Sequence, residues 1–165
     1  KGIGILIRSL TYTQRGKLLI VGDGPYKNWL VNLVKKLDLN DRVIFVGPVD
    51  DYWLPSYYSA TDVVILPSTS RLEAFGIVGL EGMATAKPLI LSDIPGVRDV
   101  ISEREGYIVE PLDPSAIAEA LEKIWNAPEM AREMGLRGRE RVEKLFSWEK
   151  VSKDVESVFK NILSK

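Results

Sequence analysis

The 165-residue sequence contains no cysteine and no histidine. Without cysteine, disulfides and thiolate metal sites are excluded, and the composition is compatible with a reducing cytoplasm. Without histidine, the chain lacks the side chain that most often serves as a general base near neutral pH. Any catalysis must therefore use carboxylates, lysines, backbone dipoles or the substrate itself.

An excess of one charge is also absent. The chain has 22 Lys and Arg against 23 Asp and Glu, a net charge of −1, and the charges are scattered. We therefore expect no general attraction to nucleic acid or to an anionic membrane surface. No apolar run approaches the ~20 residues of a membrane span, and no signal peptide opens the chain. Because the chain opens on Lys1 and Gly2 instead of methionine, we expect a fragment of a longer protein.

Short β-branched runs alternate with longer helical patterns, which predicts an α/β fold with a doubly wound, parallel, Rossmann-like sheet. Hydrophobic residues make up 45% of the chain, enough for one well-buried domain over residues 1–165. The expected strands are 17–22, 42–47, 62–67, 87–92 and 106–110. The expected helices between them are 3–12, 25–37, 52–60, 75–86 and 114–126.

Residues 128–165 are expected to form a helical tail, broken near Phe146 and Ser147. The last helix, starting at Trp148, places apolar residues on one stripe with Lys and Glu opposite: Trp148, Val151, Val155, Val158 and Ile162. Such a helix must dock its apolar face, either on this domain or on a partner.

Ligands bind at the edge where parallel strands end, so the loops after the strands are the candidate sites. The first loop has Gly22 and Gly24, but Lys27 stands where a dinucleotide fingerprint needs a third glycine. We interpret it as a tight turn with Pro25 in the first helical turn. The second loop has adjacent acids, Asp50 and Asp51, which could bind a metal but are more typical of a helix N-cap.

Four aromatic residues follow those two acids, and packing is a better explanation for them than a stacking platform: Tyr52, Trp53, Tyr57 and Tyr58. The third loop precedes a helix expected to open around Phe75, Gly76, Ile77 and Val78. The amides of a first helical turn have no intrahelical acceptor, and the helix dipole adds positive charge. This pattern predicts an anion site, which Gly76 allows a ligand to approach closely.

Two carboxylates flank this predicted site. Glu73 stands just before it and would equally serve as a cap for the helix dipole. Glu81 has apolar or glycine neighbours throughout GIVGLEGMATA, so it needs hydrogen-bond donors from the protein or from a ligand. Vicinal ribose hydroxyls would serve, since one carboxylate accepts from both.

A glycosidase pair is disfavoured by this spacing. Eight helical residues span ~12 Å, whereas acid and nucleophile stand ~5–9.5 Å apart. We therefore expect two contacts with one elongated, phosphate-centred ligand. Gly76, Gly79 and Gly82 recur every three residues, which indicates close packing against the sheet or against the ligand.

The stretch LEAFGIVGLEGMATAKPLILSDIPGVRDVI resembles the nucleotide-sugar-binding, C-terminal half of retaining GT-B glycosyltransferases of family 4, or group 1. That family is marked by two glutamates with seven residues between them, here Glu73 and Glu81. KGIGILIRSL, LLIVGDGP, RVIFVGPV, YYSATDVVILPS and FSWEKV fit as well, so the resemblance covers nearly the whole chain. Gly79 and Gly82 depart from it, since the family more often has larger residues there.

The resemblance implies transfer of a hexose-type sugar from a UDP- or GDP-linked donor, with retention of configuration and without a metal or cofactor. It implies that Glu81 binds the ribose hydroxyls and that Glu73 lies beside the transferred sugar. The diphosphate and sugar hydroxyls would contact Lys1 and the amides of residues 75–78. Val49 and Asp51 bound the segment that would face the nucleobase.

The resemblance also implies missing parts. The first strand of this domain, with a glycine–arginine phosphate contact, and the acceptor domain would both lie upstream of Lys1. The chain would then be a donor-binding half that does not turn over alone, cytoplasmic, with membrane contact only through the absent half. Two other readings stay open: a non-catalytic module binding nucleotides or proteins, and a GT-B-like nucleotide-sugar epimerase or phosphorylase.

Overall fold

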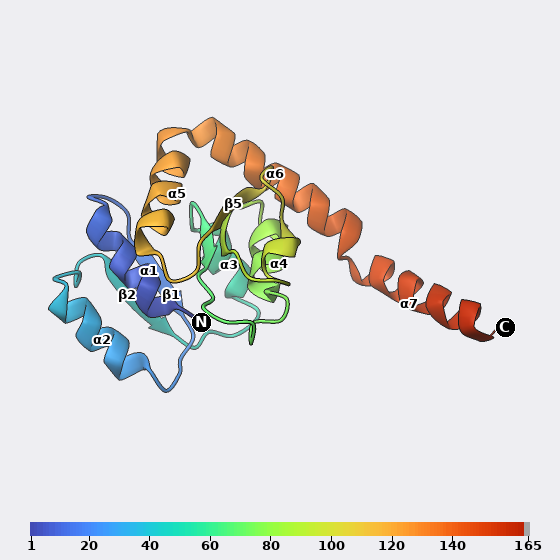
Figure 1. The fold of residues 1–165 in the computed structure, drawn as a ribbon, viewed down its shortest axis with the longest axis horizontal. Helices are drawn as coiled ribbons and strands as arrows, with labels where there is room; N and C mark the ends of the chain where they lie inside the picture. The colour runs from blue at the N-terminus through green and yellow to red at the C-terminus, as the bar shows by residue number, and fades with distance from the viewer. Residues whose placement is uncertain (164–165) are drawn as a thin grey trace.

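Strands and helices alternate along the chain in the computed structural model, which describes residues 1–163 (Figure 1). The strands are β1 Leu18–Val21, β2 Val43–Gly47, β3 Val64–Leu66, β4 Leu89–Ser92 and β5 Gly106–Val109. The helices are α1 Ile3–Ser9, α2 Lys27–Lys36, α3 Leu54–Ser59, α4 Ile77–Ala84, α5 Pro114–Asn126, α6 Pro128–Leu145 and α7 Trp148–Leu163. Two 3₁₀ turns, Leu10–Tyr12 and Arg98–Val100, complete the elements. The predicted α/β order is confirmed, with most boundaries shortened by one or two residues.

Every strand pair in the described chain is parallel, as predicted, but the strands form two sheets. β1 pairs with β2, while β4 lies between β3 and β5. The doubly wound arrangement is therefore present with a break between β1 and β3.

Helices cover both faces of the three-stranded sheet, which explains why its strands are almost entirely apolar. Leu89 and Leu91 of β4 pack with Met83 of α4 on one face. Ile90, between them in sequence, packs on the opposite face with α1 and α5 residues such as Leu6 and Ile117. Side chains alternate between faces along a strand, so a run buried on both faces has no polar positions.

Helix α4 lies close to the sheet because its inward positions are glycines. A Cβ on Gly82 would stand 2.8 Å from a Leu89 methyl and 3.0 Å from Val64 Cβ. A Cβ on Gly79 would meet its nearest atom, on Val100, at 3.4 Å. The predicted close packing of these glycines is confirmed, and its partner is the sheet side of the domain.

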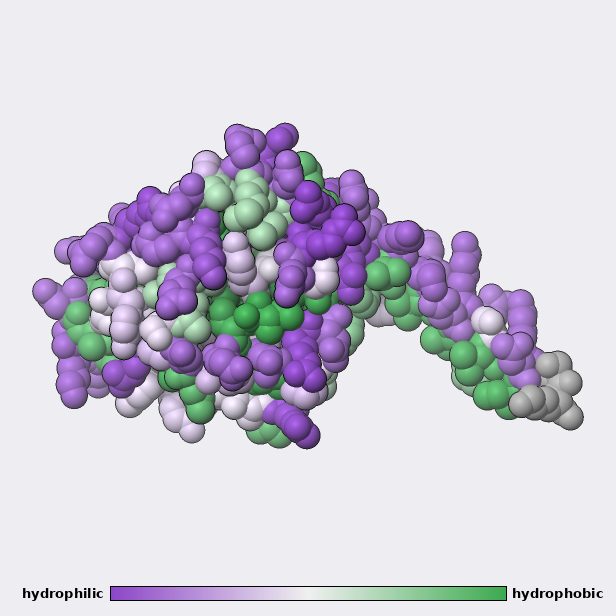
Figure 2. Space-filling model, turned by 45° about the horizontal axis from the view of Figure 1, so that its top comes forward, coloured by the Kyte–Doolittle hydropathy of each residue, from purple (hydrophilic) through white to green (hydrophobic). Residues whose placement is uncertain are grey.

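The predicted helical tail is confirmed, including the break between α6 and α7 after Leu145. α6 packs on α4, while α7 extends away from the body of the molecule (Figure 1). Apolar side chains along α7 are exposed, as the green band on the projecting helix in Figure 2 shows. Residues 164 and 165, the last two of the expected tail, lie outside the described residues.

Two expectations about loop residues are wrong. Pro25 is not in the first turn of α2, which begins at Lys27 with Tyr26 as its N-cap. Neither Asp50 nor Asp51 caps α3, which begins at Leu54 after the N-cap Trp53. Asp50 instead accepts a hydrogen bond from the Tyr52 amide at 2.8 Å, closing the turn before the helix.

Candidate functional site

Helix α4 begins at the edge where β3 and β4 end. Gly76 is its N-cap, with φ of +74°. This left-handed conformation favours glycine, and a Cβ at Gly76 would stand 2.8 Å from a Leu66 methyl. In the described chain no side chain caps α4, and its first turn carries no acid. Its N-terminus therefore presents backbone amides and the positive end of the helix dipole without a neutralising side chain.

The helix starts two residues later than predicted. Ile77 and Val78 belong to its first turn, as expected, whereas Phe75 and Gly76 lie in the preceding turn. Glycine at 76 breaks the helical path because its positive φ cannot continue an α-helix.

The loop after β4 packs against the turn that precedes α4. A Cβ on Gly96, in the loop after β4, would stand 2.1 Å from the Ala74 carbonyl oxygen. The ring of Phe75 meets that of Phe146 edge to face, with centroids 5.8 Å apart. The α4 entry is thus held by the β4 loop and by the α6–α7 junction.

Glu73 forms an ion pair with Lys1, in which Lys1 Nζ donates to Glu73 Oε2. The side chain of Glu73 is 16% exposed and that of Lys1 is 66% exposed. The alternative role of Glu73 as a cap is wrong, because it stands four residues before α4 and does not cap it. The fold instead places this carboxylate beside a cation 72 residues away in sequence.

Glu81 lies one turn into α4 and is partly buried. Its Oε2 accepts a hydrogen bond from the hydroxyl of Tyr58, on α3, at 2.6 Å. Burial and the adjacent Glu81 carboxylate raise the pKa of the Tyr58 phenol well above its usual value. The predicted need of Glu81 for a donor is therefore met in part by the protein. Sequence patterns assigned Tyr58 to packing and gave no sign of this contact.

The second predicted loop is only partly at the site. Val49 lines the same cavity as Lys1, Val78 and Glu81. Asp51 is exposed and does not line that cavity. Within residues 1–163, no group of three or more acidic residues is arranged to hold a metal ion.

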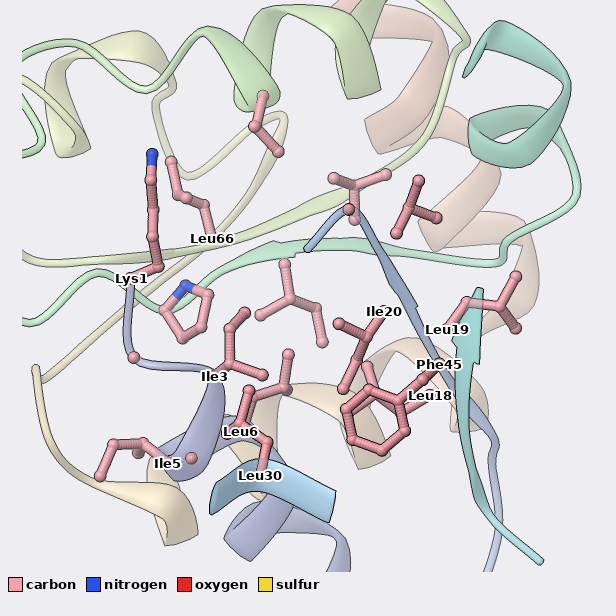
Figure 3. Close-up of a pocket in the computed structure, with 18 of the residues that line it drawn as sticks. Lys1, Ile3, Ile5, Leu6, Leu18, Leu19, Ile20, Leu30, Phe45 and Leu66 are labelled. Carbon is pink, nitrogen blue, oxygen red and sulfur yellow. The ribbon is translucent and has the colours of Figure 1, made fainter. Parts of the chain in front are cut away.

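The cavity has a volume of about 1110 Å³ and runs from this polar edge into the gap between β1 and β3. Its inner walls are apolar and come from β1, β3 and α1; Figure 3 shows Ile3, Leu6, Leu18 and Ile20 facing it. Lys1 stands beside Leu66 near one end. This end carries Lys1 and Glu81, charged groups of the kind that a charged, hydroxyl-rich ligand requires.

A lysine ammonium, an open helix start and two carboxylates lie at or next to this polar end: Lys1, Val78 and Glu81 line the cavity, whereas Glu73, which pairs with Lys1, and residues 75–77 do not. The ammonium and the amides attract anions such as phosphates. The carboxylates accept hydrogen bonds from hydroxyl groups. One ligand bearing both phosphate and sugar hydroxyls would satisfy all four.

Among the described helices, none is both long and apolar enough to cross a bilayer.

Comparison with known proteins identifies a family that this chain matches. A family model described as glycosyl transferases group 1 matches residues 1–141. The N-acetyl-alpha-D-glucosaminyl L-malate synthase of Bacillus anthracis is 35% identical over 148 residues, covering 89% of this chain. Those residues are 38% of that enzyme.

Solved structures share the fold over almost the whole chain. A sucrose-phosphate synthase from Thermosynechococcus elongatus superposes with a TM-score of 0.90 and 35% identity, over 99% of this chain and 43% of that one. Anabaena HepE, crystallised with UDP-glucose, superposes with a TM-score of 0.90 and 23% identity, which shows the fold alone. It matches 98% of this chain and 45% of HepE.

The chain thus spans less than half the length of these proteins. The match nonetheless includes the α4 entry, both glutamates and Lys1, all within residues 1–141. On this match, the chain belongs to the group 1 family of glycosyl transferases.

Proposed function

We propose that the intact protein transfers a sugar from a nucleotide-diphosphate sugar to an acceptor with retention of anomeric configuration, and that this chain supplies the donor-binding half. The observation that carries the proposal is the uncapped start of α4 with Lys1, Glu73 and Glu81 around it. Membership of the family supports the reaction class.

Each polar group has a role in this proposal. Lys1 and the amides of residues 75–78 bind the diphosphate and the hydroxyls of the donor sugar. Glu73 lies beside the transferred sugar, and Glu81 accepts hydrogen bonds from the ribose hydroxyls. Residues 49–51 face the nucleobase, with Val49 on the cavity wall.

The placement of the carboxylates supports binding at two points of one ligand. Glu81 is the fifth residue of α4, so it lies ~6 Å along the helix axis from its first residue. Glu73 precedes the helix by four residues and is engaged by Lys1. The anion site thus lies between them along the chain, as a sugar–diphosphate–ribose ligand requires.

In the proposed reaction the bond between the anomeric carbon and the donor phosphate oxygen breaks. The acceptor hydroxyl oxygen forms the new bond to that carbon on the same face, and its proton passes to the leaving diphosphate. Negative charge grows on the diphosphate as the bond breaks. The Lys1 ammonium and the α4 amides stabilise that charge in place.

UDP-glucose is the first donor to test, because HepE, with the same fold, was crystallised with it. The absence of cysteine is consistent with a cytoplasmic location for such an enzyme. The acceptor would bind in the part of the longer protein that this chain lacks.

We also propose that a further β-strand, from the polypeptide preceding Lys1 in the longer protein, occupies the apolar end of the cavity. This apolar end is the gap between β1 and β3, which we call the slot. Each of these two strands pairs with a neighbouring strand on one side only. Side chains of β1 are only partly covered, whereas Leu89, Ile90 and Leu91 of β4, flanked on both sides, are 0% exposed. A parallel apolar strand would join the two sheets into one.

The experiment that tests the donor site is Glu81→Ala in the intact protein, titrated with UDP, GDP and ADP by calorimetry. We expect the affinity for the nucleotide that binds most tightly to fall ~10–100-fold, because the ribose hydroxyls lose a charged acceptor. The matched control is Glu119→Ala on the exposed side of α5, which should bind normally. Unchanged affinity in Glu81→Ala would remove the assignment, and an intact protein that binds nucleotide but transfers no sugar would indicate a binding module.

A further inference from the structure

We infer that Tyr58 is a positioning residue that fixes the Glu81 carboxylate for the ribose hydroxyls and thereby sets the preference for ribose. The inference rests on the proposed role of Glu81. It assigns a specific task to a side chain that the sequence pattern assigned only to packing.

Tyr58 is anchored at both ends of its side chain. Its ring packs against the apolar cluster beneath α4, which contains Val64, Leu66 and Met83. Its hydroxyl reaches Glu81 Oε2 at 2.6 Å. The contact joins α3 to α4 across 23 positions of sequence, so it forms only in the folded domain.

The phenol acts only as a donor towards Glu81. Because burial and the carboxylate raise its pKa, the phenol keeps its proton throughout the physiological pH range. An ionised carboxylate has no proton to donate, so the hydrogen bond has one direction. Tyr58 therefore orients the Glu81 side chain by donating to one of its oxygens.

The contact leaves acceptor capacity for a ligand. A carboxylate offers about four lone-pair positions over its two oxygens, and Tyr58 uses one of them on Oε2. Oε1 and the remaining position on Oε2 stay available to two neighbouring hydroxyls. Glu81 also lines the cavity, so these positions are within reach of a ligand.

Fixing the carboxylate before binding improves recognition. A free glutamate side chain samples many rotamers and loses that freedom when a ligand orders it. With Tyr58 in place, the ordering occurs during folding, so less of the hydroxyl-binding free energy is lost. The gain applies only to ligands that use the carboxylate, and it is therefore specific for the ribose hydroxyls.

The test is Tyr58→Phe in the intact protein, which removes one oxygen and keeps the ring in its cluster. Affinities are measured for the tightest of UDP, GDP and ADP and for its 2′-deoxy analogue. We expect the wild type to prefer the ribonucleotide by about tenfold. In Tyr58→Phe the affinity for the ribonucleotide should fall ~3–10-fold, while the affinity for the deoxynucleotide changes less than about twofold. The preference for the ribonucleotide therefore falls.

Two controls separate the inference from its alternatives. Tyr12→Phe removes the same oxygen from a tyrosine that is 62% exposed and far in sequence from both Tyr58 and Glu81, and should leave the preference unchanged. In Glu81→Ala the preference should vanish, and adding Tyr58→Phe to it should cause no further loss.

The outcomes are distinguishable. A Tyr58→Phe variant with lower thermal stability but a tenfold ribose preference would show a purely structural contact and overturn the inference alone. A Glu81→Ala variant that keeps the full preference would overturn the role of Glu81, and with it that of Tyr58. Failure of the wild type to bind any of the three nucleotides would overturn the proposed function itself.

Discussion

The two glutamates differ in the partner that the fold gives them. Glu73 pairs with a cation, Lys1, at the helix entry, while Glu81 accepts from a neutral phenol, Tyr58, within the body of the domain. A cation beside a carboxylate suits a place where phosphate charge develops. A neutral donor suits a carboxylate that must stay free to accept from hydroxyl groups.

The first residue-scale prediction concerns Glu73→Gln in the intact protein. The amide keeps the shape of the side chain but removes the charge beside Lys1, where we propose that the transferred sugar lies. We expect kcat to fall ~10²–10³-fold, with donor KM changed far less, because the charge stabilises the transition state more than the bound donor. Steady-state kinetics check this, with Glu140→Gln, exposed on α6, as the control.

The second residue-scale prediction compares Gly82→Ala with Gly79→Ala. Alanine at 82 places its Cβ 2.8 Å from a Leu89 methyl, so it should destabilise the protein by ~1–3 kcal/mol. Alanine at 79 meets Val100 at 3.4 Å, so the ~1 kcal/mol gain in helix propensity should offset any strain. Thermal unfolding of both variants checks this. Equal melting temperatures would mean that α4 can shift away from the sheet.

At the scale of an element, α4 and α5 start in opposite ways. Asp113 caps α5 by accepting from the amides of Ser115 at 2.8 Å and Ala116 at 3.1 Å. Among the described residues, no side chain does this for α4. One helix start is thus closed by its own sequence, whereas the other keeps its first amides uncapped, as the proposed donor site requires.

This contrast gives a pH prediction. The hydrogen bond from the Ser115 hydroxyl, with those from the Ala116 and Ser115 amides, lowers the Asp113 pKa from 3.8. The cap therefore stabilises the fold above pH 3.8, and this stability is lost as pH falls through the lowered pKa. Asp113→Asn keeps an acceptor oxygen but cannot titrate.

We expect the wild type to be more stable than Asp113→Asn above pH 3.8. The stabilities of the two should converge as the pH falls through the lowered pKa of Asp113. Urea unfolding between pH 5 and pH 2 would measure the difference. Asp41→Asn, which removes the same charge from a surface turn, corrects for the general effect of charge on acid stability. A constant difference across the range would mean that the carboxylate charge adds nothing to the cap.

At the scale of the whole molecule, the sheet is split where a parallel α/β sheet is ordinarily most buried. The amides of Leu18 in β1 and of Gly22, just after β1, donate hydrogen bonds on the side of β2. The amide of Val64 in β3 donates on the side of β4. Since bonding directions alternate along a parallel strand, the amides of Leu19 and Ile65 should face the slot.

The proposed inserted strand predicts hydrogen exchange at those two amides. Leu19 and Ile65 should exchange at least ~100-fold more slowly in the intact protein than in the 165-residue chain, because a new strand would accept from both. Ile90 of β4 is the internal control, since it has partners on both sides in either form. Rates that are equal at Leu19 and Ile65 in both forms would exclude a strand in the slot.

The sequence by itself determined the α/β order, the parallel pairing, the helical tail and the presence of two carboxylates near one helix start, whereas only the structure showed that Glu73 does not cap that helix. Apolar runs, glycine spacing and charged residues are local features, and each of these conclusions depends on local pattern. The pattern placed the start of α4 two residues early because it gave no measure of the Gly76 backbone angle.

Only the tertiary structure decided which distant residues meet. The contacts of Lys1 with Glu73 and of Tyr58 with Glu81 join positions 72 and 23 residues apart, and no periodicity encodes such pairs. The split between β1 and β3 is likewise a property of the assembled sheet, since each strand on its own has the same apolar pattern as a paired one. Contacts between elements depend on how the whole chain packs, which is why they had to be seen in three dimensions.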